Sequence, residues 1–193
     1  MADSVEKFVR FLARYPGSIL AKTKITPNQI TFLGLSLNCA VAYLIARGQL
    51  SYLTIGILIW IAGFFDALDG SVARITGRTT IFGNFWDSVL DRYSDTVIYF
   101  GILLYFLELG KANYVILIVV AIIGSLIVSY SRAKAESLDQ ECKIGVMPRP
   151  VRIIVLGASF CIGQIFLGLL VIAILSHITV LQRILHVYKK LRK

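Results

Sequence analysis

Four aspartates interrupt the apolar sequence between residues 66 and 91, and they constrain this chain more than any other feature. Asp66 and Asp69 are three residues apart, so they share one face of a helix. Asp87 and Asp91 are four apart and share a face of the next helix. Carboxylates inside apolar helices are costly and are functional candidates by default. Placed antiparallel, the two helices would present four carboxylates to one pocket, where they would repel one another unless cations lay between them.

The composition is that of a membrane protein. Of the 193 residues, 57% are hydrophobic, and the mean hydropathy is +0.77, which is too apolar for a soluble domain of this size. Five or six spans of about 20 residues use up most of the length. The predicted fold is therefore all-α and polytopic, with residues 1–193 forming a single membrane domain. The three cysteines show no CxxC spacing and indicate neither a disulfide nor a metal site.

Polar turns divide the apolar sequence and predict a six-helix transmembrane bundle over residues 26–190. A helix start is indicated by Thr26 before Pro27. The expected spans cover residues 28–46, 52–74, 83–107 and 113–136. The apolar run from 151 to 178 is too long for one span, so we expect a break at Gly163-Gln164 and a sixth span that reaches about residue 188. A five-span interpretation would place the C-terminus on the other side of the membrane.

Residues 1–25 precede the first span and contain an amphipathic pattern. Val5, Phe8, Val9 and Leu12 recur at helical spacing, with basic residues between them. This pattern predicts a juxtamembrane helix that lies on the membrane surface. It does not resemble a signal peptide, because no apolar core precedes a small-residue cleavage site.

The basic residues are distributed unevenly between the two sides of the predicted bundle. Of the 20 lysines and arginines, only Arg47 and Lys111 lie in turns on the side opposite the termini, and Arg92 lies within the third span. This positive-inside bias predicts that both termini face the cytoplasm, as does the aspartate segment. The net charge of +9 is then explained by orientation and by contact with anionic lipid, and nucleic acid is not expected as a partner.

The residues around the four aspartates suit phosphoryl transfer. Hard carboxylate oxygens favour Mg²⁺ or Mn²⁺, and two such ions could clamp a transferring phosphoryl group. Small residues at Gly70, Ala73 and Gly83 would let a ligand approach the backbone, and Arg74 could pair with a phosphate. Asp95 continues the spacing of four beyond Asp91, in either a supporting or a purely structural role.

The full pattern, D-x2-D-G-x2-A-R-x8-G-x3-D-x3-D, resembles the signature of the CDP-alcohol phosphotransferases, integral membrane enzymes that make phospholipids. The resemblance implies transfer of a phosphatidyl-type group from a CDP-linked lipid to an alcohol, with release of CMP, and a homodimer. It implies that Asp66, Asp69 and Asp87 bind one metal ion, that Asp66, Asp87 and Asp91 bind a second, and that Asp91 is the general base. It further implies that the CDP moiety is bound by Asp69, Gly70, Ala73, Arg74, Thr80 and Gly83.

Three segments in the second half of the chain bear on the acceptor: S-Y-S-R-A-K-A-E at 129–136, R-P-V-R at 149–152, and T-V-L-Q-R at 179–183. This many cations near a metal site suits an acceptor that carries its own phosphate. The segments resemble those of the phosphatidylinositol-phosphate and archaetidylinositol-phosphate synthases. By that match, inositol phosphate would be bound by Ser129, Arg132, Lys134, Arg149, Arg152 and Arg183.

Several alternatives remain open at this point. Pro148 and Val151 stand where that branch often has glutamate, so glycerol phosphate, serine and free inositol stay possible acceptors. The cations could instead simply mark cytoplasmic helix ends. The donor could be CDP-diacylglycerol or CDP-archaeol, in the plasma membrane of a bacterium or an archaeon. An ion-coupled transporter would use the aspartates differently, but it predicts internal repeats that this sequence does not show.

Overall fold

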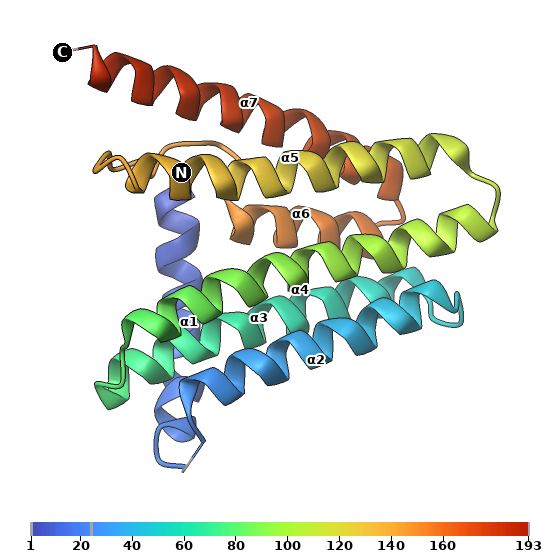
Figure 1. The fold of residues 1–193 in the computed structure, drawn as a ribbon. Helices are drawn as coiled ribbons and strands as arrows, with labels where there is room; N and C mark the ends of the chain where they lie inside the picture. Colours follow the sequence, from blue (N-terminus) through green and yellow to red (C-terminus); the bar gives the residue numbers. More distant parts are fainter. Residues whose placement is uncertain (1, 24, 193) are drawn as a thin grey trace.

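Every regular element of the described chain is a helix, as the sequence predicts. The computed structural model describes residues 2–23 and 25–192. Within these ranges the helices are α1 (Ala2–Leu20), α2 (Pro27–Ala46), α3 (Tyr52–Thr76), α4 (Ile81–Glu108), α5 (Ala112–Glu136), α6 (Arg149–Cys161) and α7 (Ile165–Leu191) (Figure 1).

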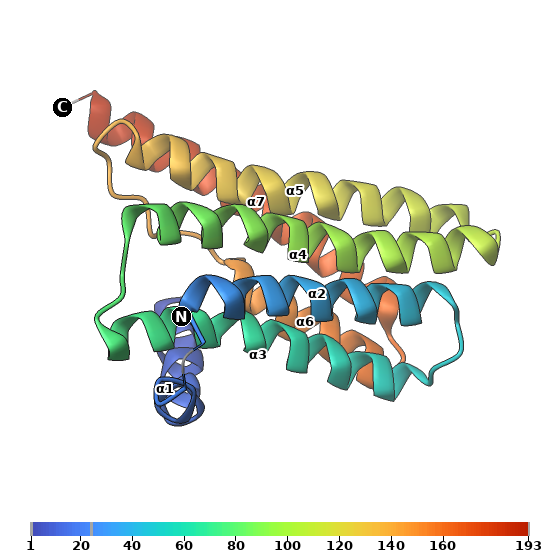
Figure 2. The ribbon, with the colours of Figure 1, turned by 60° about the horizontal axis from the view of Figure 1, so that its bottom comes forward.

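Helices α2 to α7 run back and forth along one common direction, and α1 lies across them at one end (Figures 1 and 2). As a result α2, α4 and α6 begin at the end where α3, α5 and α7 finish. Helix α2 packs against α3 and α4, α5 packs against α4 and α7, and α6 packs against α3 and α7. The connection from α3 to α4 and the long loop from α5 to α6 therefore both lie at the end that α1 crosses.

Four of these helices, α2, α3, α5 and α7, are long and apolar enough to cross a membrane. Helix α4 has 28 residues, but Asp87, Asp91, Arg92 and Asp95 lie within residues 81–95 of it. Helix α6 has only 13 residues and is about 20 Å long, which is shorter than the roughly 30 Å hydrocarbon core. The number and order of the predicted helices are thus observed, while the crossing of the membrane by all six stays a prediction.

The predicted turns are observed close to their expected positions. Thr26 caps α2, because its hydroxyl accepts a hydrogen bond from the Gln29 amide while the Gln29 side chain accepts one from the Thr26 amide. The expected break between the last two helices is also present. Helix α6 ends at Cys161, and Gly163 adopts φ +69°, a left-handed conformation that favours glycine.

Helix α1 extends beyond the predicted residues 4–15 and continues through Pro16 to Leu20. Ala13 and Gly17 are buried, and an added Cβ at Gly17 would lie 2.9 Å from Ser71 Cβ of α3. Phe8, Phe11 and other apolar side chains point away from the bundle and are exposed. The side chains of residues 2–4, 6, 7 and 10, among them basic residues of the amphipathic pattern, lie outside the described residues. The membrane-surface position of α1 therefore remains a prediction.

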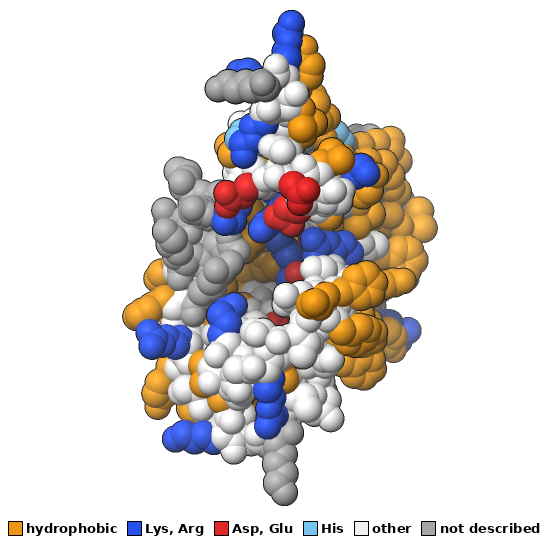
Figure 3. Space-filling model, turned by 60° about the vertical axis from the view of Figure 1, so that its left-hand side comes forward, with side chains coloured by type: hydrophobic (Ala, Val, Ile, Leu, Met, Phe, Trp, Pro, Cys, Tyr) orange, Lys and Arg blue, Asp and Glu red, His pale blue; other side chains and the backbone are white. Residues whose placement is uncertain are grey.

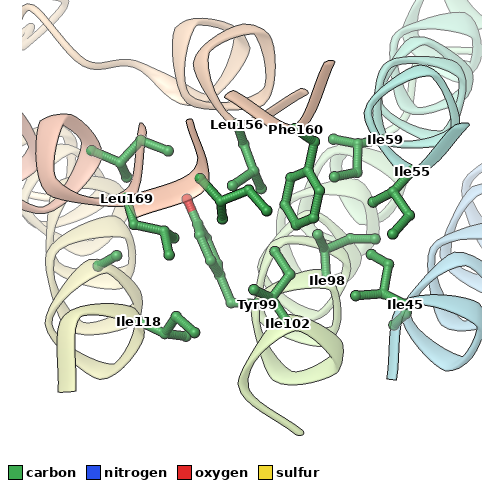
Figure 4. Close-up of a cluster of buried hydrophobic side chains, with 14 of the residues drawn as sticks. Ile45, Ile55, Ile59, Ile98, Tyr99, Ile102, Ile118, Leu156, Phe160 and Leu169 are labelled. Atoms are coloured by element: carbon green, nitrogen blue, oxygen red, sulfur yellow. The ribbon is translucent and has the colours of Figure 1, made fainter. Parts of the chain in front are cut away.

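The main hydrophobic core is formed by side chains from all of the helices α2 to α7 (Figure 4). Ile45, Ile102, Phe160 and Leu169 are fully buried within it. Close approach of α2 and α4 depends on Gly101, because a Cβ there would collide with the backbone of Ala42. This packing fixes the positions of α3, α4 and α6, whose ends at the α1 side of the bundle carry the polar residues described next.

Candidate active site

A cavity of about 270 Å³ opens at the end of the bundle where α3 finishes and α4 and α6 begin. The space-filling view shows that this end is hollowed: lysine, arginine and acidic side chains stand around the opening, and further acidic atoms are visible inside it (Figure 3). Eleven of the fifteen site residues predicted from the sequence line this cavity: Asp66, Asp69, Gly70, Arg74, Asp87, Asp91, Ser129, Arg132, Arg149, Arg152 and Arg183. Predicted metal, donor and acceptor residues therefore share one cavity.

Arg149 connects α6 to three aspartates on two other helices. Its Nη2 lies 2.6 Å from Asp66 Oδ2, its Nη1 lies 2.6 Å from Asp91 Oδ1, and its Nε lies 2.9 Å from Asp95 Oδ1. Arg149 begins α6 and is followed by Pro150, which suits a first helical turn because the missing N–H would have no partner there. The start of α6 is thus fixed at the acidic side of the cavity.

Asp66 is further supported from α2. The Asn38 amide lies 3.4 Å from Asp66 Oδ2 and donates a 2.9 Å hydrogen bond to the Gly34 carbonyl. A Cβ on Gly34 would lie 2.5 Å from Asp66 Oδ1, so only glycine leaves room for the carboxylate. An asparagine four residues after a glycine in an apolar span was the available signal for this support, and sequence reasoning missed it.

Asp69 and Asp87 lie between the large cavity and a smaller one of about 40 Å³. The Gly70 amide donates to Asp69 Oδ1, whereas Asp69 Oδ2 is buried and has no hydrogen-bond partner among the described residues. The smaller cavity collects most of the predicted CDP-binding residues, namely Asp69, Gly70, Ala73, Thr80 and Gly83. Arg74 faces the larger cavity instead.

Thr80 has a structural task beside its predicted one. It caps α4, since its hydroxyl accepts a 2.9 Å hydrogen bond from the Gly83 amide. A Cβ on Gly83 would lie 2.9 Å from that hydroxyl and 3.4 Å from Asn28 Oδ1. The glycine of the signature therefore allows the cap and keeps the smaller cavity open.

The predicted acceptor residues are not equivalent in the structure. Arg152 and Arg183 are buried, with 2% and 4% of their surface exposed, while Arg132 is half-exposed and pairs with Glu136 at 2.8 Å. Ser129 lies one turn before Arg132 and lines the same cavity. Lys134 is exposed and does not line the cavity. The structure thus brings together five of the six predicted acceptor residues.

Helix α7 holds the loop between α5 and α6 in place. The Thr179 hydroxyl accepts a 3.0 Å hydrogen bond from the Met147 amide, and Arg183 Nε donates to the Ile144 carbonyl at 3.0 Å. Arg183 Nη1 also donates to the Val128 carbonyl of α5. These contacts fix the loop that places Pro148 and Arg149 at the cavity. Thr179 belongs to the T-V-L-Q-R segment at 179–183, but its role in fixing the loop could not be inferred from residue spacing.

Comparison with known proteins agrees with this arrangement. A sequence model of the CDP-alcohol phosphatidyltransferase family matches residues 24–187. The chain belongs to this family. It is therefore an enzyme of the CDP-alcohol phosphotransferase type, and the transporter interpretation is not supported.

Two curated relatives within the family carry related names. The chain is 38% identical to an archaetidylinositol phosphate synthase of Pyrococcus horikoshii over 177 residues, which is 91% of this chain and 90% of that protein. It is 33% identical to a phosphatidylinositol phosphate synthase of Cutibacterium acnes over 186 residues, 87% of this chain and 88% of that one. Each of these matches extends over nearly the whole chain.

Solved structures of the family show the same fold. The phosphatidylinositol phosphate synthase of Mycobacterium tuberculosis with CDP-DAG bound superimposes with a TM-score of 0.82 at 27% identity, covering 91% of this chain and 93% of that one. The same enzyme in complex with manganese and citrate gives a TM-score of 0.81 at 26% identity, covering 91% and 88%. The family uses divalent metals, so the carboxylates of this chain must be tested for their fit to one.

The carboxylates fit a divalent cation in chemistry, although Arg149 takes up two of them. No three Asp, Glu, His or Cys side chains of the described residues are grouped closely enough to hold a metal ion. The Arg149 guanidinium pairs with both Asp66 and Asp91. The buried Asp69 Oδ2 without a partner is an oxygen that a hard cation would satisfy. A divalent cation could therefore be bound by Asp66, Asp69, Asp87 and Asp91 once Arg149 gave up its ion pairs with Asp66 and Asp91.

Proposed function

We propose that this enzyme transfers the phosphatidyl-type group of a CDP-linked lipid to inositol phosphate and releases CMP. The observation that carries the proposal is that one cavity is lined both by the aspartates of the signature and by three buried or half-buried arginines, Arg149, Arg152 and Arg183. A neutral acceptor would not need this much positive charge. The names of the relatives, which are inositol-phosphate lipid synthases of bacteria and archaea, support the same acceptor.

The proposed reaction needs one proton acceptor and one leaving group. The acceptor hydroxyl attacks the β-phosphorus of the CDP-lipid, the bond from that phosphorus to the bridging oxygen breaks, and CMP leaves with that oxygen. Asp91 takes the hydroxyl proton, for which it must exchange its hydrogen bond with Arg149. The products are the inositol-phosphate phospholipid and CMP, and the proton passes from Asp91 to solvent.

Two divalent cations, Mg²⁺ or Mn²⁺, are proposed as cofactors. Asp66, Asp69 and Asp87 would hold one, and Asp66, Asp87 and Asp91 the other. When bound, they would acidify the acceptor hydroxyl and neutralise charge on the phosphates. The residues of this chain that then bind the donor are those of the smaller cavity together with Arg74, while Ser129 and Arg132 bind the acceptor with the buried arginines.

The proposal includes the setting of the enzyme. We infer one membrane domain of six spans in a prokaryotic plasma membrane, with both termini and the cavity on the cytoplasmic side and a homodimer as the assembly. Helix α1 and the end of α7 lie at one end of the bundle (Figures 1 and 2), and the residues that line the cavity lie at the same end, which is consistent with this topology. Helix α1 would lie in the cytoplasmic membrane surface, where a lipid donor enters.

CMP release by the purified protein in detergent tests the proposal. CDP-diacylglycerol and CDP-archaeol would each be offered with Mg²⁺ and, in parallel, with inositol phosphate, glycerol phosphate, serine or inositol. Release that depends on inositol phosphate supports the proposal. Release with glycerol phosphate alone would support the proposed use of a CDP-linked donor but would contradict inositol phosphate as the acceptor. No release with any acceptor, from protein that remains folded, would contradict it.

A further inference from the structure

Asp95 lies outside the eight-residue signature but makes two ion pairs at the edge of the cavity. It follows Asp91 by one helical turn on α4. Its Oδ1 accepts from Arg149 Nε at 2.9 Å, and its Oδ2 accepts from Arg152 Nη2 at 2.7 Å. Its side chain is 13% exposed. A single, largely buried carboxylate therefore pairs with both arginines of the R-P-V-R segment.

The ion pair with Arg149 determines how that guanidinium is oriented. Because a guanidinium is planar and rigid, fixing Nε at Asp95 also limits the directions in which Nη1 and Nη2 can donate. Those two nitrogens lie 2.6 Å from Asp91 and Asp66, the aspartates that the proposed reaction uses. Asp95 is the one carboxylate partner of Arg149 that has no task in the proposed reaction.

The ion pair with Arg152 extends the arrangement to the loop before α6. Arg152 is 2% exposed, its Nη1 donates to the Met147 carbonyl at 3.2 Å, and its Nε has no partner among the described residues. A buried guanidinium without a counterion is strongly unfavourable. Asp95 thus holds Arg152, and through it the segment that leads into Arg149.

We infer that Asp95 is a positioning residue for the acceptor site: it holds Arg149 and Arg152 side by side, and it keeps Arg149 in place through Nε when metal ions take over Asp66 and Asp91 and leave Nη1 and Nη2 to the phosphate of the acceptor. The inference rests on the proposed function, because it assumes an acceptor that carries a phosphate. It predicts that loss of the Asp95 charge weakens use of the acceptor and leaves use of the donor nearly unchanged.

Asp95→Asn is the direct test. The asparagine keeps the shape, but its one carbonyl oxygen can accept from only one arginine, and its amide group would face the other. We expect the KM for inositol phosphate to rise about tenfold or more, as for loss of a charge-assisted hydrogen bond, with the KM for the CDP-lipid changed less than about twofold. Asp139→Asn is the matched control, because it removes one carboxylate from an exposed loop position. Equal increases in both KM values would overturn the inference.

A double-mutant cycle separates positioning from general support of the fold. Arg149→Lys keeps the positive charge but removes Nε and the fork that Asp95 orients. If Asp95 acts through Arg149, Asp95→Asn should change the acceptor KM only slightly in the Arg149→Lys background. Full additivity of the two effects would contradict positioning. Asp95→Glu serves as the second variant where Asp95→Asn does not fold, and its retained charge should preserve acceptor use better than any neutral residue.

A binding measurement distinguishes failure of this inference from failure of the proposed function. Inositol phosphate with Mg²⁺ should raise the midpoint of thermal unfolding of the wild-type protein in detergent, and the increase at the same ligand concentration should be clearly smaller in Asp95→Asn. If the wild type releases CMP only with another phosphorylated acceptor, the same comparison is made with that compound. An increase that is unchanged in Asp95→Asn would overturn the role of Asp95 whether or not the enzyme uses inositol phosphate.

Discussion

The two sides of the cavity are built in different ways. We call Asp66, Asp69, Asp87 and Asp91 the acidic wall, and Arg132, Arg149, Arg152 and Arg183 the basic wall. The acidic wall comes from two consecutive helices, α3 and α4, joined by the short connection 77–80. The basic wall comes from three helices, α5, α6 and α7, and depends on the loop between α5 and α6.

This difference determines how each wall should respond to change. Helix periodicity alone places the acidic pairs on common faces, so a substitution there removes a chemical group and leaves the geometry largely in place. The basic wall depends on contacts between distant residues, such as the hydrogen bonds from Arg183 to Ile144 and from Met147 to Thr179. We therefore expect losses of turnover from the acidic wall and losses of acceptor binding from the basic wall.

Removal of divalent metal should have the largest effect, and it should act through the acidic wall alone. With excess EDTA, CMP release should fall to background, because the four carboxylates would lose the ions that neutralise the phosphates. Mg²⁺ or Mn²⁺ in excess over the chelator should restore it. Thermal unfolding in EDTA serves as the control for an intact fold. Full activity in excess chelator would refute the metal-dependent mechanism.

Asp91→Asn should have the next largest effect. Loss of a general base lowers the rate by about 10²- to 10⁴-fold, so CMP release should drop by at least the lower figure. Binding of the CDP-lipid, measured by its stabilisation of the protein against thermal unfolding, should be partly retained. Asp139→Asn should match the wild type in both measurements. A fall in donor binding as large as the fall in turnover would mean that Asp91 acts in binding and not as a base.

The same contrast explains what the sequence could predict. The aspartate faces, the helix order and the break at Gly163 follow from residue spacing, and the structure has them close to where they were expected. Crossing contacts could not be predicted in this way: Arg149 reaches Asp66, 83 positions earlier, only because α6 packs against α3. Spacing carries no information about which helices become neighbours.

Helix periodicity could have refined one prediction. Arg132 and Lys134 are two residues apart on α5 and therefore point about 200° away from each other. Ser129 and Arg132, three apart, share a face and line the cavity, whereas Lys134 does not. A motif match assigned both cations to the acceptor, although one helix face can present only one of them to a single site.

Thr179→Val tests the basic wall at its support and should have an intermediate effect. The substitution removes the hydroxyl that accepts the hydrogen bond of the Met147 amide, and because both residues are buried, no water can replace it. An unsatisfied buried amide costs about 1–3 kcal/mol, so the midpoint of thermal unfolding in detergent should fall. The KM for the acceptor should rise more than that for the donor. Thr179→Ser keeps the hydroxyl and should preserve the acceptor KM. A lower midpoint with an unchanged acceptor KM would show that binding does not require a fixed loop.

Arg132→Ala should give the smallest change in stability and thereby the cleanest measure of direct contact with the acceptor. Its pair with Glu136 is 41% and 48% exposed, and exposed pairs of this spacing contribute only about 0.3–0.5 kcal/mol. Glu136→Ala removes the same pair but keeps the guanidinium at the cavity. Both variants therefore lose this pair, while only Arg132→Ala should raise the acceptor KM, by severalfold. If the two variants raise that KM equally, the pair and not the guanidinium matters, and the basic wall of the cavity reduces to its three arginines on α6 and α7.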